Sequence, residues 1–252
     1  KLEPPVAVQY REYTVYTCGP WCQGPVTAEA LKLLEGDDLK SLGHNSPDYI
    51  HLVSQALDLA FSDRHHYYGD PDFVDVPIEG LVSDGYARER RRAIDMGRAF
   101  PEMPPPGDAW AYQGRPGKKV SARQPSPVTG GSEQDTSYTC VVDRWGNAFS
   151  ATPSDGIFGS PIVPGLGFPL GTRAQMFSLD PAHPNALMPG KRPRTTLTPS
   201  LALRDGEPWL AFGTPGGDQQ DQWTLQFFLN VVDFGMDLQA AIDAPTFHSL
   251  HF

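Results

Sequence analysis

Cysteine is scarce in this sequence, and positive charge is in deficit. The 252 residues include three cysteines, too few and too odd a number for a fold built on disulfides. The 20 Lys and Arg stand against 30 Asp and Glu, a formal charge of −10 that argues against nucleic acid or an anionic membrane surface as the main partner. No apolar run approaches the roughly 20 residues that a membrane-spanning helix needs. The remaining composition is that of a globular protein with room for one large domain or two modest ones.

Metal and disulfide chemistry find little support in the residue spacing. Cys18 and Cys22 lie in one Gly/Pro turn, where a local disulfide and two unpaired thiols both fit. The histidine pairs at 65–66 and at 248 and 251 lack cysteine or carboxylate partners at ligand spacing, so no zinc site is predicted. No other metal and no organic cofactor is implied. The chain has no initiator Met and no signal-peptide pattern, and we expect a fragment truncated at both ends.

Local patterns predict the elements of the first half of the chain. Alternation over residues 6–16 predicts two strands with a turn at Arg11-Glu12. A serine cap followed by proline, Ser46-Pro47, predicts the start of a helix that runs to about His65. Two further helices are expected over 26–34 and 84–96, and the arginines of the second are expected to form a solvated face: Arg88, Arg90, Arg91 and Arg92.

The second half is richer in strand signals. Asp205-Gly206 between two apolar runs is a strong hairpin signal, and a second hairpin is expected around Arg144-Trp145-Gly146. Helices are expected over 218–232 and 238–243. Hairpins followed by helices indicate sheets packed on helices, an α/β (α+β) layered fold.

The junction Asp135-Thr136 separates the two halves. A Pro/Gly-rich stretch at about 98–134, expected to be a mobile loop, leads directly into a strand that Thr136 opens. An N-terminal nucleophile hydrolase places its catalytic residue at such a point: the chain is cut before the threonine, and the freed α-amine serves as base for the hydroxyl. The plain alternative is a threonine chosen for its β-propensity.

Four stretches of the sequence resemble the γ-glutamyltransferase (γ-glutamyltranspeptidase) family. Each is weak alone, but their order along the chain is specific. They are Gly43–Pro47 with Asp63-Arg64 and Gly69–Val74; Asp135–Ser137 with Val141–Asn147; Pro184–Ala186 with Pro189–Pro193; and Thr214–Gly217 with Gly235–Leu238 and Asp243–His248. The resemblance implies the four-layer αββα sandwich of N-terminal nucleophile hydrolases. It implies that 1–135 is the end of a large-subunit-like region and 136–252 a small-subunit-like catalytic region, together one structural domain.

The resemblance also implies roles for particular residues. Thr136 resembles the processing residue and the acyl-accepting nucleophile, with Asp135 on the other side of the bond that is cut. Ser154 falls where the family has a second hydroxyl that orients the nucleophile's amine. Gly216-Gly217 matches the oxyanion hole, for which the alternative is an ordinary helix-entry turn. Thr195-Thr196 stands where two serines bind the substrate's carboxylate end; the alternative is two strand residues ahead of Pro199.

Departures from the family bear on the substrate. Where the family has an acid for the substrate's α-amino group, this chain has Arg173-Ala174-Gln175-Met176, without a carboxylate. Asp155 is a candidate substitute. Arg173 and Arg194 are expected to make the pocket more cationic, which suits a substrate with an extra carboxylate.

Three functions are consistent with these observations. The first is a self-processing enzyme that cleaves or transfers a γ-glutamyl group from a glutathione-like amide, with its large and small subunits associated after the cut. The second keeps the threonine nucleophile but acts on another carboxylated amide, as a cephalosporin-type acylase does. The third is a non-catalytic relative. The intact Thr136 and Gly216-Gly217 argue against the third, and the sequence favours the first at the level of the family.

Overall fold

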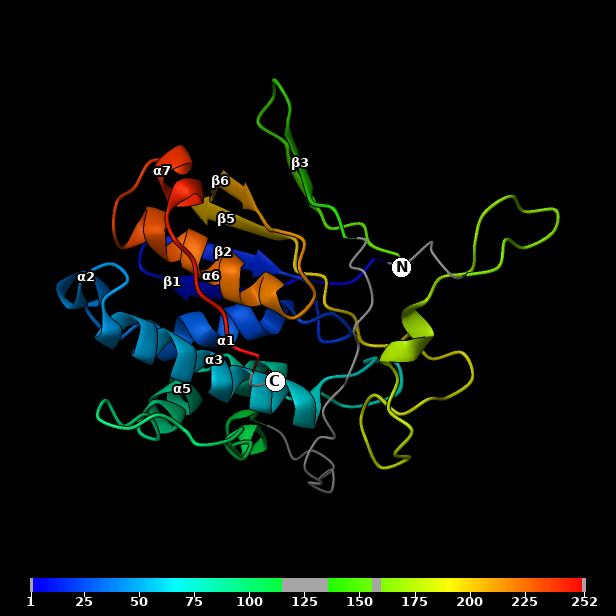
Figure 1. Cartoon of the computed structure of the whole chain (residues 1–252), viewed down its shortest axis with the longest axis horizontal. Coiled ribbons are helices and arrows are strands. Elements are labelled where there is room, and N and C mark those ends of the chain that lie inside the picture. Colours follow the sequence, from blue (N-terminus) through cyan, green and yellow to red (C-terminus); the bar gives the residue numbers. More distant parts are fainter. Residues whose placement is uncertain (1, 115–135, 156–159, 251–252) are drawn as a thin grey trace.

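An antiparallel sheet with the strand order β1-β2-β5-β6 organises the chain (Figure 1). The structure is a computed structural model that describes residues 2–114, 136–155 and 160–250. The strands are β1 (Val6–Tyr10), β2 (Tyr13–Thr17), β5 (Ser200–Arg204) and β6 (Glu207–Phe212). Both hairpins of this sheet, β1–β2 and β5–β6, confirm the sequence prediction. The central pairing of β2 with β5 joins residues on the two sides of Asp135-Thr136.

Alternation along the strands buries one face of this sheet. In β1 the side chains of Val6, Val8 and Tyr10 are buried, whereas Ala7 and Gln9 between them are exposed. Helices α1 (Gly24–Leu34) and α6 (Gln219–Val232) cover the buried face, and Figure 1 shows α3 (Pro47–Tyr67) and α5 (Asp84–Arg91) beyond α1. Aromatic contacts join α6 to the sheet, with the ring of Phe228 stacked on Phe212 at 5.1 Å between centroids.

The helix predicted from Ser46-Pro47 is confirmed as α3. The Ser46 side chain accepts a hydrogen bond from the backbone N–H of Tyr49 at 3.1 Å, and Pro47 is the first helical residue. The remaining helices are short: α2 (Leu39–Leu42), α4 (Ile78–Leu81), α7 (Leu238–Asp243), and the 3₁₀ turns η1 (Ala109–Tyr112) and η2 (Arg173–Met176). Helix α7 ends at Asp243, two residues before Pro245, as the sequence predicts.

A second, separate hairpin carries the start of the predicted small-subunit-like region. Strands β3 (Thr139–Val142) and β4 (Ala148–Ala151) pair with each other, and Figure 1 shows them projecting from the body of the molecule. The structure thus shows a mixed α/β arrangement. The full four-layer sandwich stays an expectation, because the described residues form one larger sheet with helices on one face and this two-stranded hairpin.

Helix α5 corrects two predictions. It ends at Arg91, not at 96, and the chain then turns so that Ile94 enters the core with 7% of its surface exposed. The predicted solvated arginine face is wrong for Arg90, which shares the buried side of the helix with Tyr86 and Ala87. Its guanidinium donates to the buried carboxylate of Asp63, with Nε at 3.2 Å from Oδ2. A charge pattern alone does not reveal a buried partner contributed by another helix.

The first part of the predicted mobile loop makes hydrogen bonds to α3. Residues 98–114 lie along α3, where Ser62 Oγ donates to the carbonyl of Pro104 at 2.6 Å and Tyr67 donates to the carbonyl of Gly107 at 2.6 Å. Asp63 Oδ1 accepts from the N–H of Gly107 at 2.9 Å. Residues 115–134 of the predicted loop lie outside the described residues, as does Asp135. The cysteines are free thiols, so Cys18 and Cys22 are unpaired here.

Candidate active site

Two hydroxyl groups meet where the second hairpin begins and ends. Thr136 and Ser154 form an antiparallel bridge, and the N–H of Ser137 donates to the carbonyl of Pro153 at 2.9 Å. This pairing brings Thr136 Oγ1 to 2.7 Å from Ser154 Oγ. Because either hydroxyl can donate, a proton can be shared between the two oxygens without movement of the backbone.

A cation lies against this pair. Arg173 Nη2, from η2, donates to Ser154 Oγ, and the N–H of Thr172 donates to Asp155 Oδ1 at 3.0 Å. The two contacts tie the 172–173 segment to the residues that follow β4. A guanidinium beside two hydroxyls favours negative charge developing on either oxygen. The structure therefore brings four of the predicted residues into one contact network: Thr136, Ser154, Asp155 and Arg173.

The Gly216-Gly217 turn leads into α6. Gly216 has φ 136° and Gly217 has φ 58°, and a Cβ on Gly216 would lie 2.6 Å from Cζ3 of Trp223. Side chains are therefore excluded at Gly216 by backbone conformation and by space. Upstream, a Cβ on Gly213 would lie 2.5 Å from Cε2 of Tyr138, so the chain entering this turn passes close to the residues that follow Thr136.

A buried arginine, to which the sequence assigned no role, anchors this turn from α3. Arg64 is 1% exposed, and its Nη1 donates to Asp218 Oδ1 at 2.6 Å and to Gln23 Oε1 at 2.5 Å. Gln23 Nε2 in turn donates to the carbonyl of Gly217 at 3.2 Å. Arg64 thus holds the turn from both sides. The Asp63-Arg64 motif was part of the family resemblance, but the partners of Arg64, Gln23 and Asp218, lie 41 and 154 residues away and could not be read from it.

The predicted carboxylate-binding pair is packed into the protein. Thr195 and Thr196 are each 6% exposed. Thr195 Oγ1 donates to Cys22 Sγ at 3.4 Å, and its N–H donates to the carbonyl of Trp21 at 2.8 Å. Thr196 Oγ1 accepts from Gln220 Nε2 at 3.3 Å, in the first turn of α6. The pair therefore lies beside the glycine turn, on the side where Gln220 begins α6.

Arg194, the remaining predicted residue, lies deeper than its expected place in a pocket. It is 6% exposed, and its backbone N–H donates to Asn185 Oδ1 at 2.8 Å. Burial, and then repulsion from Arg64, lowers the pKa of Arg194 to about 9. Burial acts to raise the pKa of Asp218, the residue directly after Gly217, but Arg64 and then Arg194 lower it on balance. Arg194 therefore belongs with the glycine turn and not with the Arg173 contact.

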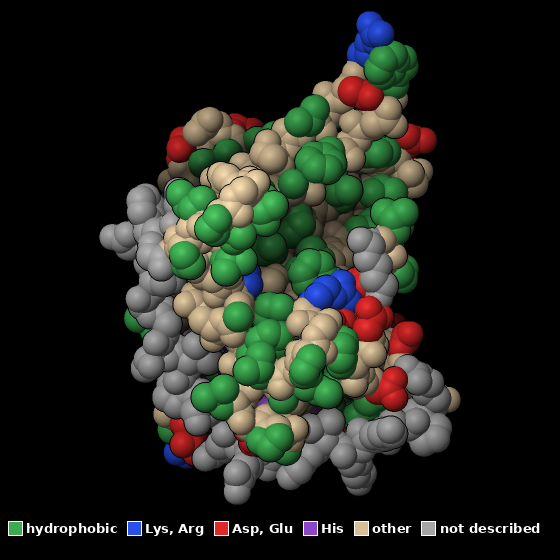
Figure 2. Space-filling view, turned by 90° about the vertical axis from the view of Figure 1, so that its right-hand side faces the viewer, with side chains coloured by type: hydrophobic (Ala, Val, Ile, Leu, Met, Phe, Trp, Pro, Cys, Tyr) green, Lys and Arg blue, Asp and Glu red, His purple; other side chains and the backbone are tan. Residues whose placement is uncertain are grey.

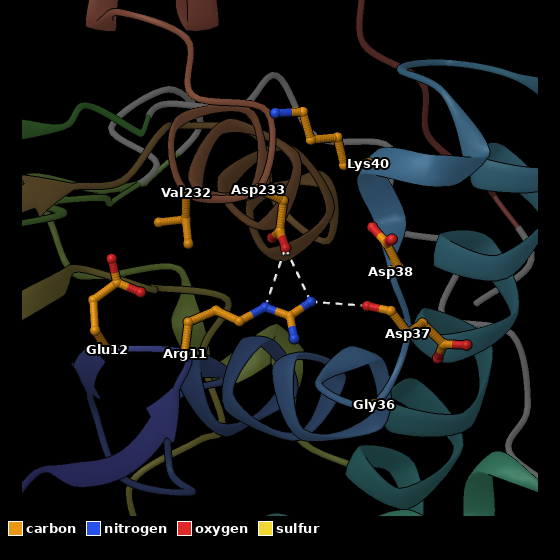
Figure 3. Close-up of a pocket in the computed structure, with 8 residues that line it drawn as sticks. All are labelled: Arg11, Glu12, Gly36, Asp37, Asp38, Lys40, Val232 and Asp233. Carbon is orange, nitrogen blue, oxygen red and sulfur yellow. Dashed lines mark hydrogen bonds and ion pairs between the residues drawn. The ribbon is translucent and has the colours of Figure 1, made fainter.

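A surface pocket elsewhere does not contain these residues. It has a volume of about 410 Å³, and Figure 3 shows Arg11 bound inside it to Asp233 and to the backbone of Asp37. Arg11 Nη2 lies 3.0 Å from Asp233 Oδ1, and Arg11 Nη1 donates to the carbonyl of Glu35 at 2.7 Å. These donors serve protein acceptors, so the ion pair fastens the β1–β2 turn to the ends of α1 and α6.

The face that carries the β3–β4 hairpin and the 160–188 segment differs from this pocket in being largely apolar. Figure 2 shows hydrophobic side chains gathered around a hollow in which Lys or Arg side chains are visible. Across residues 2–114, 136–155 and 160–250, no group of three or more His, Cys, Asp or Glu side chains is placed to hold a metal ion. Within the same ranges, no helix has both the length and the apolar character needed to cross a bilayer.

Comparison with known proteins decides the family. The family model described as Gamma-glutamyltranspeptidase matches residues 1–251. The chain belongs to this family. It is 34% identical over 257 residues to the glutathione hydrolase proenzyme of Escherichia coli and 34% identical over 248 residues to the acylase ACY 1 proenzyme of a Pseudomonas species. Glutathione hydrolases and acylases are thus equally similar to this member of the γ-glutamyltranspeptidase family.

Solved structures agree. The chain superimposes on the structure described as LmbA2991HD with a TM-score of 0.81 at 45% identity, covering 99% of this chain and 43% of that one. A cephalosporin acylase from Bacillus halodurans gives a TM-score of 0.74 at 32% identity, covering 97% of this chain and 40% of that one. The chain also spans 41% of the E. coli relative and 40% of the Pseudomonas acylase, while those alignments cover 97% of this chain.

Proposed function

We propose that this chain carries the nucleophile of a self-processing enzyme that transfers an acyl group from an amide. The observation that supports this most directly is the 2.7 Å separation of Thr136 Oγ1 and Ser154 Oγ, with Arg173 donating to the serine. At the level of the family, the acyl group is γ-glutamyl or a related carboxylated acyl group, and the donor is a small amide such as glutathione.

The first chemical step is processing of the chain itself. Thr136 Oγ1 attacks the carbonyl carbon of Asp135, the Asp135–Thr136 C–N bond breaks, and an ester joins the two residues. Water then hydrolyses the ester, leaving a carboxylate on Asp135 and a free α-amine on Thr136. Ser154 takes part by accepting or donating the hydroxyl proton at 2.7 Å.

The second step is turnover. The α-amine of Thr136 takes the proton of its own hydroxyl, and Oγ1 attacks the substrate's amide carbonyl to form an acyl-enzyme. The Gly216-Gly217 turn, with the positive end of α6 behind it, is proposed to stabilise the oxyanion. The proton passes to the leaving amine, and water or an acceptor amine releases the acyl group.

A second candidate is an acylase that acts on a different carboxylated amide. The sequence Arg173–Met176 in η2 supports it, because that turn supplies a cation to Ser154 and no carboxylate for a substrate ammonium. Both candidates use the same nucleophile and differ in the acyl group, so they share the test of Thr136.

Intact mass measurement and N-terminal sequencing of the full-length protein test the nucleophile. We expect two associated fragments, the smaller beginning Thr136-Ser137-Tyr138. Thr136→Ala should remain one uncut chain and lose at least about a thousandfold in turnover, whereas Thr136→Ser should retain part of both. Thr14→Ala, on strand β2 away from the site, is the matched control and should process as the parent does. Turnover by an uncut Thr136→Ala protein would refute the assignment.

A further inference from the structure

The segment that carries Arg173 is fixed against the residues that follow β4. The N–H of Thr172 donates to Asp155 Oδ1 at 3.0 Å, and a Cβ on Gly171 would lie 2.8 Å from Asp155 Oδ2. From this position Arg173 Nη2 donates to Ser154 Oγ. The buried Nε of Arg173 has no hydrogen-bond partner among the described residues, so that edge of the guanidinium is uncompensated. A largely unmatched cation is therefore held at the hydroxyl pair.

The contact with Arg173 gives a direction to the hydrogen bond between the two hydroxyls. A guanidinium has donors and no acceptors, so Ser154 Oγ accepts from it and keeps its own proton to give. A hydroxyl that accepts from a cation is polarised and becomes a stronger donor. At 2.7 Å, Ser154 therefore donates to Thr136 Oγ1. The proton of Thr136 is then free to point to the α-amine of the same residue once the chain is cut.

The same cation bears on the protonation of that amine. An unperturbed α-amine titrates at about pH 8, so at pH 7 it is mostly an ammonium, which cannot take a proton. A neighbouring positive charge disfavours the ammonium. Arg173 acts on the amine across two hydrogen bonds, about 6 Å, and a charge at that distance makes an ammonium about tenfold more acidic. The free base is then present at neutral pH.

The other titratable groups beside the amine leave the cation in control. Both carboxylate oxygens of Asp155 lie against the backbone of residues 171–172. Burial raises the pKa of Tyr138 to about 12, so its phenol is neutral. The thiol of Cys140 contacts Tyr138, further along the hairpin. The charge at the amine is therefore set by Arg173, with Asp155 opposing it.

We propose that Arg173 is a positioning residue: through Ser154 it turns the hydroxyl proton of Thr136 toward the α-amine, and its charge keeps that amine free to accept the proton. Arg173 then acts on the base of the enzyme and not on the substrate. The proton balance is that of the proposed reaction, since the amine takes the proton of Oγ1 and returns it to the leaving amine. This inference rests on the proposed function, because the α-amine exists only after the chain is cut.

Titration of the Thr136 amine tests this without any substrate. On the processed full-length protein, mass spectrometry follows the rate at which acetic anhydride acetylates that amine as the pH is varied. Arg173→Gln keeps an N–H donor but no charge, and its titration should move up by about one in pH. Arg173→Lys keeps both and should titrate as the parent does. Asp155→Asn removes a negative charge, and its titration should move down.

Activity should follow the amine. The acidic limb of kcat/KM reports the free enzyme, and the p-nitroanilides of glutamic and glutaric acid are the probes. Arg173→Gln should lose about tenfold below pH 6 and approach the parent at pH 9, because only the protonation of the amine has changed. Arg144→Gln is the matched control: it removes one exposed guanidinium, packed on the Trp145 ring at the far end of the same hairpin, and should leave the limb in place.

The outcomes separate this role from the alternatives. An unmoved titration in Arg173→Gln, with KM raised at every pH, would overturn the inference and make Arg173 a substrate contact. An equal movement in Arg144→Gln would also overturn it. If Arg173→Gln fails to fold or to be cut, Asp155→Asn decides, and an unmoved titration there refutes the electrostatic role. A parent protein that is not cut before Thr136 would refute the proposed function itself, whereas a cut parent with unmoved variants would refute only the role of Arg173.

Discussion

Two regions of the molecule differ in how far they bury their apolar side chains. The first is residues 2–114, and the second is formed by the segments 136–155 and 160–188. In the first region every residue of α1 is buried, and α3 buries side chains along its whole length. In the second, all of β3 is exposed and η2 buries nothing. Most of the exposed large apolar side chains belong to this second region: Val141, Val142, Trp145, Phe149, Ile162, Leu166, Phe168, Leu170, Leu179, Leu187 and Met188.

The contrast indicates that the first region positions the candidate site and that the second carries its reactive side chains. The close-packed region supplies Arg64 and Gln23, which fix the glycine turn, whereas Thr136, Ser154 and Arg173 lie in the lightly packed one. Exposed apolar patches of this extent usually face another surface. We therefore expect substitutions to act mainly on stability in the first region and mainly on activity in the second.

The largest difference in stability should come from matched phenylalanines. Phe61 in α3 is 0% exposed, whereas Phe149 in β4 is 58% exposed. Phe61→Ala should lower the free energy of unfolding by about 4 kcal/mol, because it leaves a cavity and removes the ring under the Arg64 guanidinium. Phe149→Ala should cost about 0.5 kcal/mol. Urea unfolding of both variants measures the difference, and equal losses would contradict the division into two regions.

Two arginine–aspartate pairs compare a buried with a partly exposed arginine inside the close-packed region. Arg64→Lys should cost about 3 kcal/mol, because a lysine cannot bind Gln23 and Asp218 together in a buried site. It should also lower kcat more than it raises KM, since the glycine turn loses its anchor. Arg91→Lys, at a pair with Asp37 whose side chains are 27% and 24% exposed, should cost about 0.5 kcal/mol. A normal kcat in Arg64→Lys would show that the anchor has no influence on the reaction.

The smallest effect concerns acid stability. Asp70 accepts from the backbone and side chain of Arg192, at 2.9 and 2.7 Å. Burial opposes the effect, but these bonds lower the pKa of Asp70 from 3.8 to about 2. A lowered folded-state pKa gives stability that is complete above pH 3.8 and lost as the pH falls through 2, here about 2 kcal/mol. Asp70→Asn should flatten the stability profile between these values, and an unchanged profile would exclude Asp70 as its source.

Local signals predicted much of the fold. The Asp205-Gly206 turn gave β5–β6 correctly because a tight turn and its two strands lie within a dozen residues. The cap at Ser46 gave the start of α3 for the same reason. The pairing of β2 with β5 and the burial of Arg90 were out of reach, since each depends on a partner distant in sequence and on the net balance of burial against charge.

The candidate site also has contacts that the sequence predicted and contacts that it did not. The contact between Thr136 and Ser154, 18 residues apart, follows from a short hairpin, and the resemblance placed Ser154 as a hydroxyl that orients the threonine's amine. The Arg64 anchor could not be predicted, because a sequence does not show which distant side chains a buried guanidinium meets. The resemblance places Thr195 and Thr196 where two serines bind the substrate's carboxylate end, and their contacts with Cys22 and Gln220 could not be read from the sequence.

The pairing of β2 with β5 has a consequence for how the cut protein would unfold and refold. Five residue pairs, from Tyr13 with Arg204 to Thr17 with Ser200, join chain segments on the two sides of the bond before Thr136. Breaking that bond would change folding from a reaction of one chain into an encounter of two. Unfolding of the cut protein would then depend on concentration, and pieces separated by heat would have to find each other again before a sheet could form. The protein would then fold once as a single chain. After the cut, its two pieces would stay associated in a structure that they could rebuild only slowly once separated.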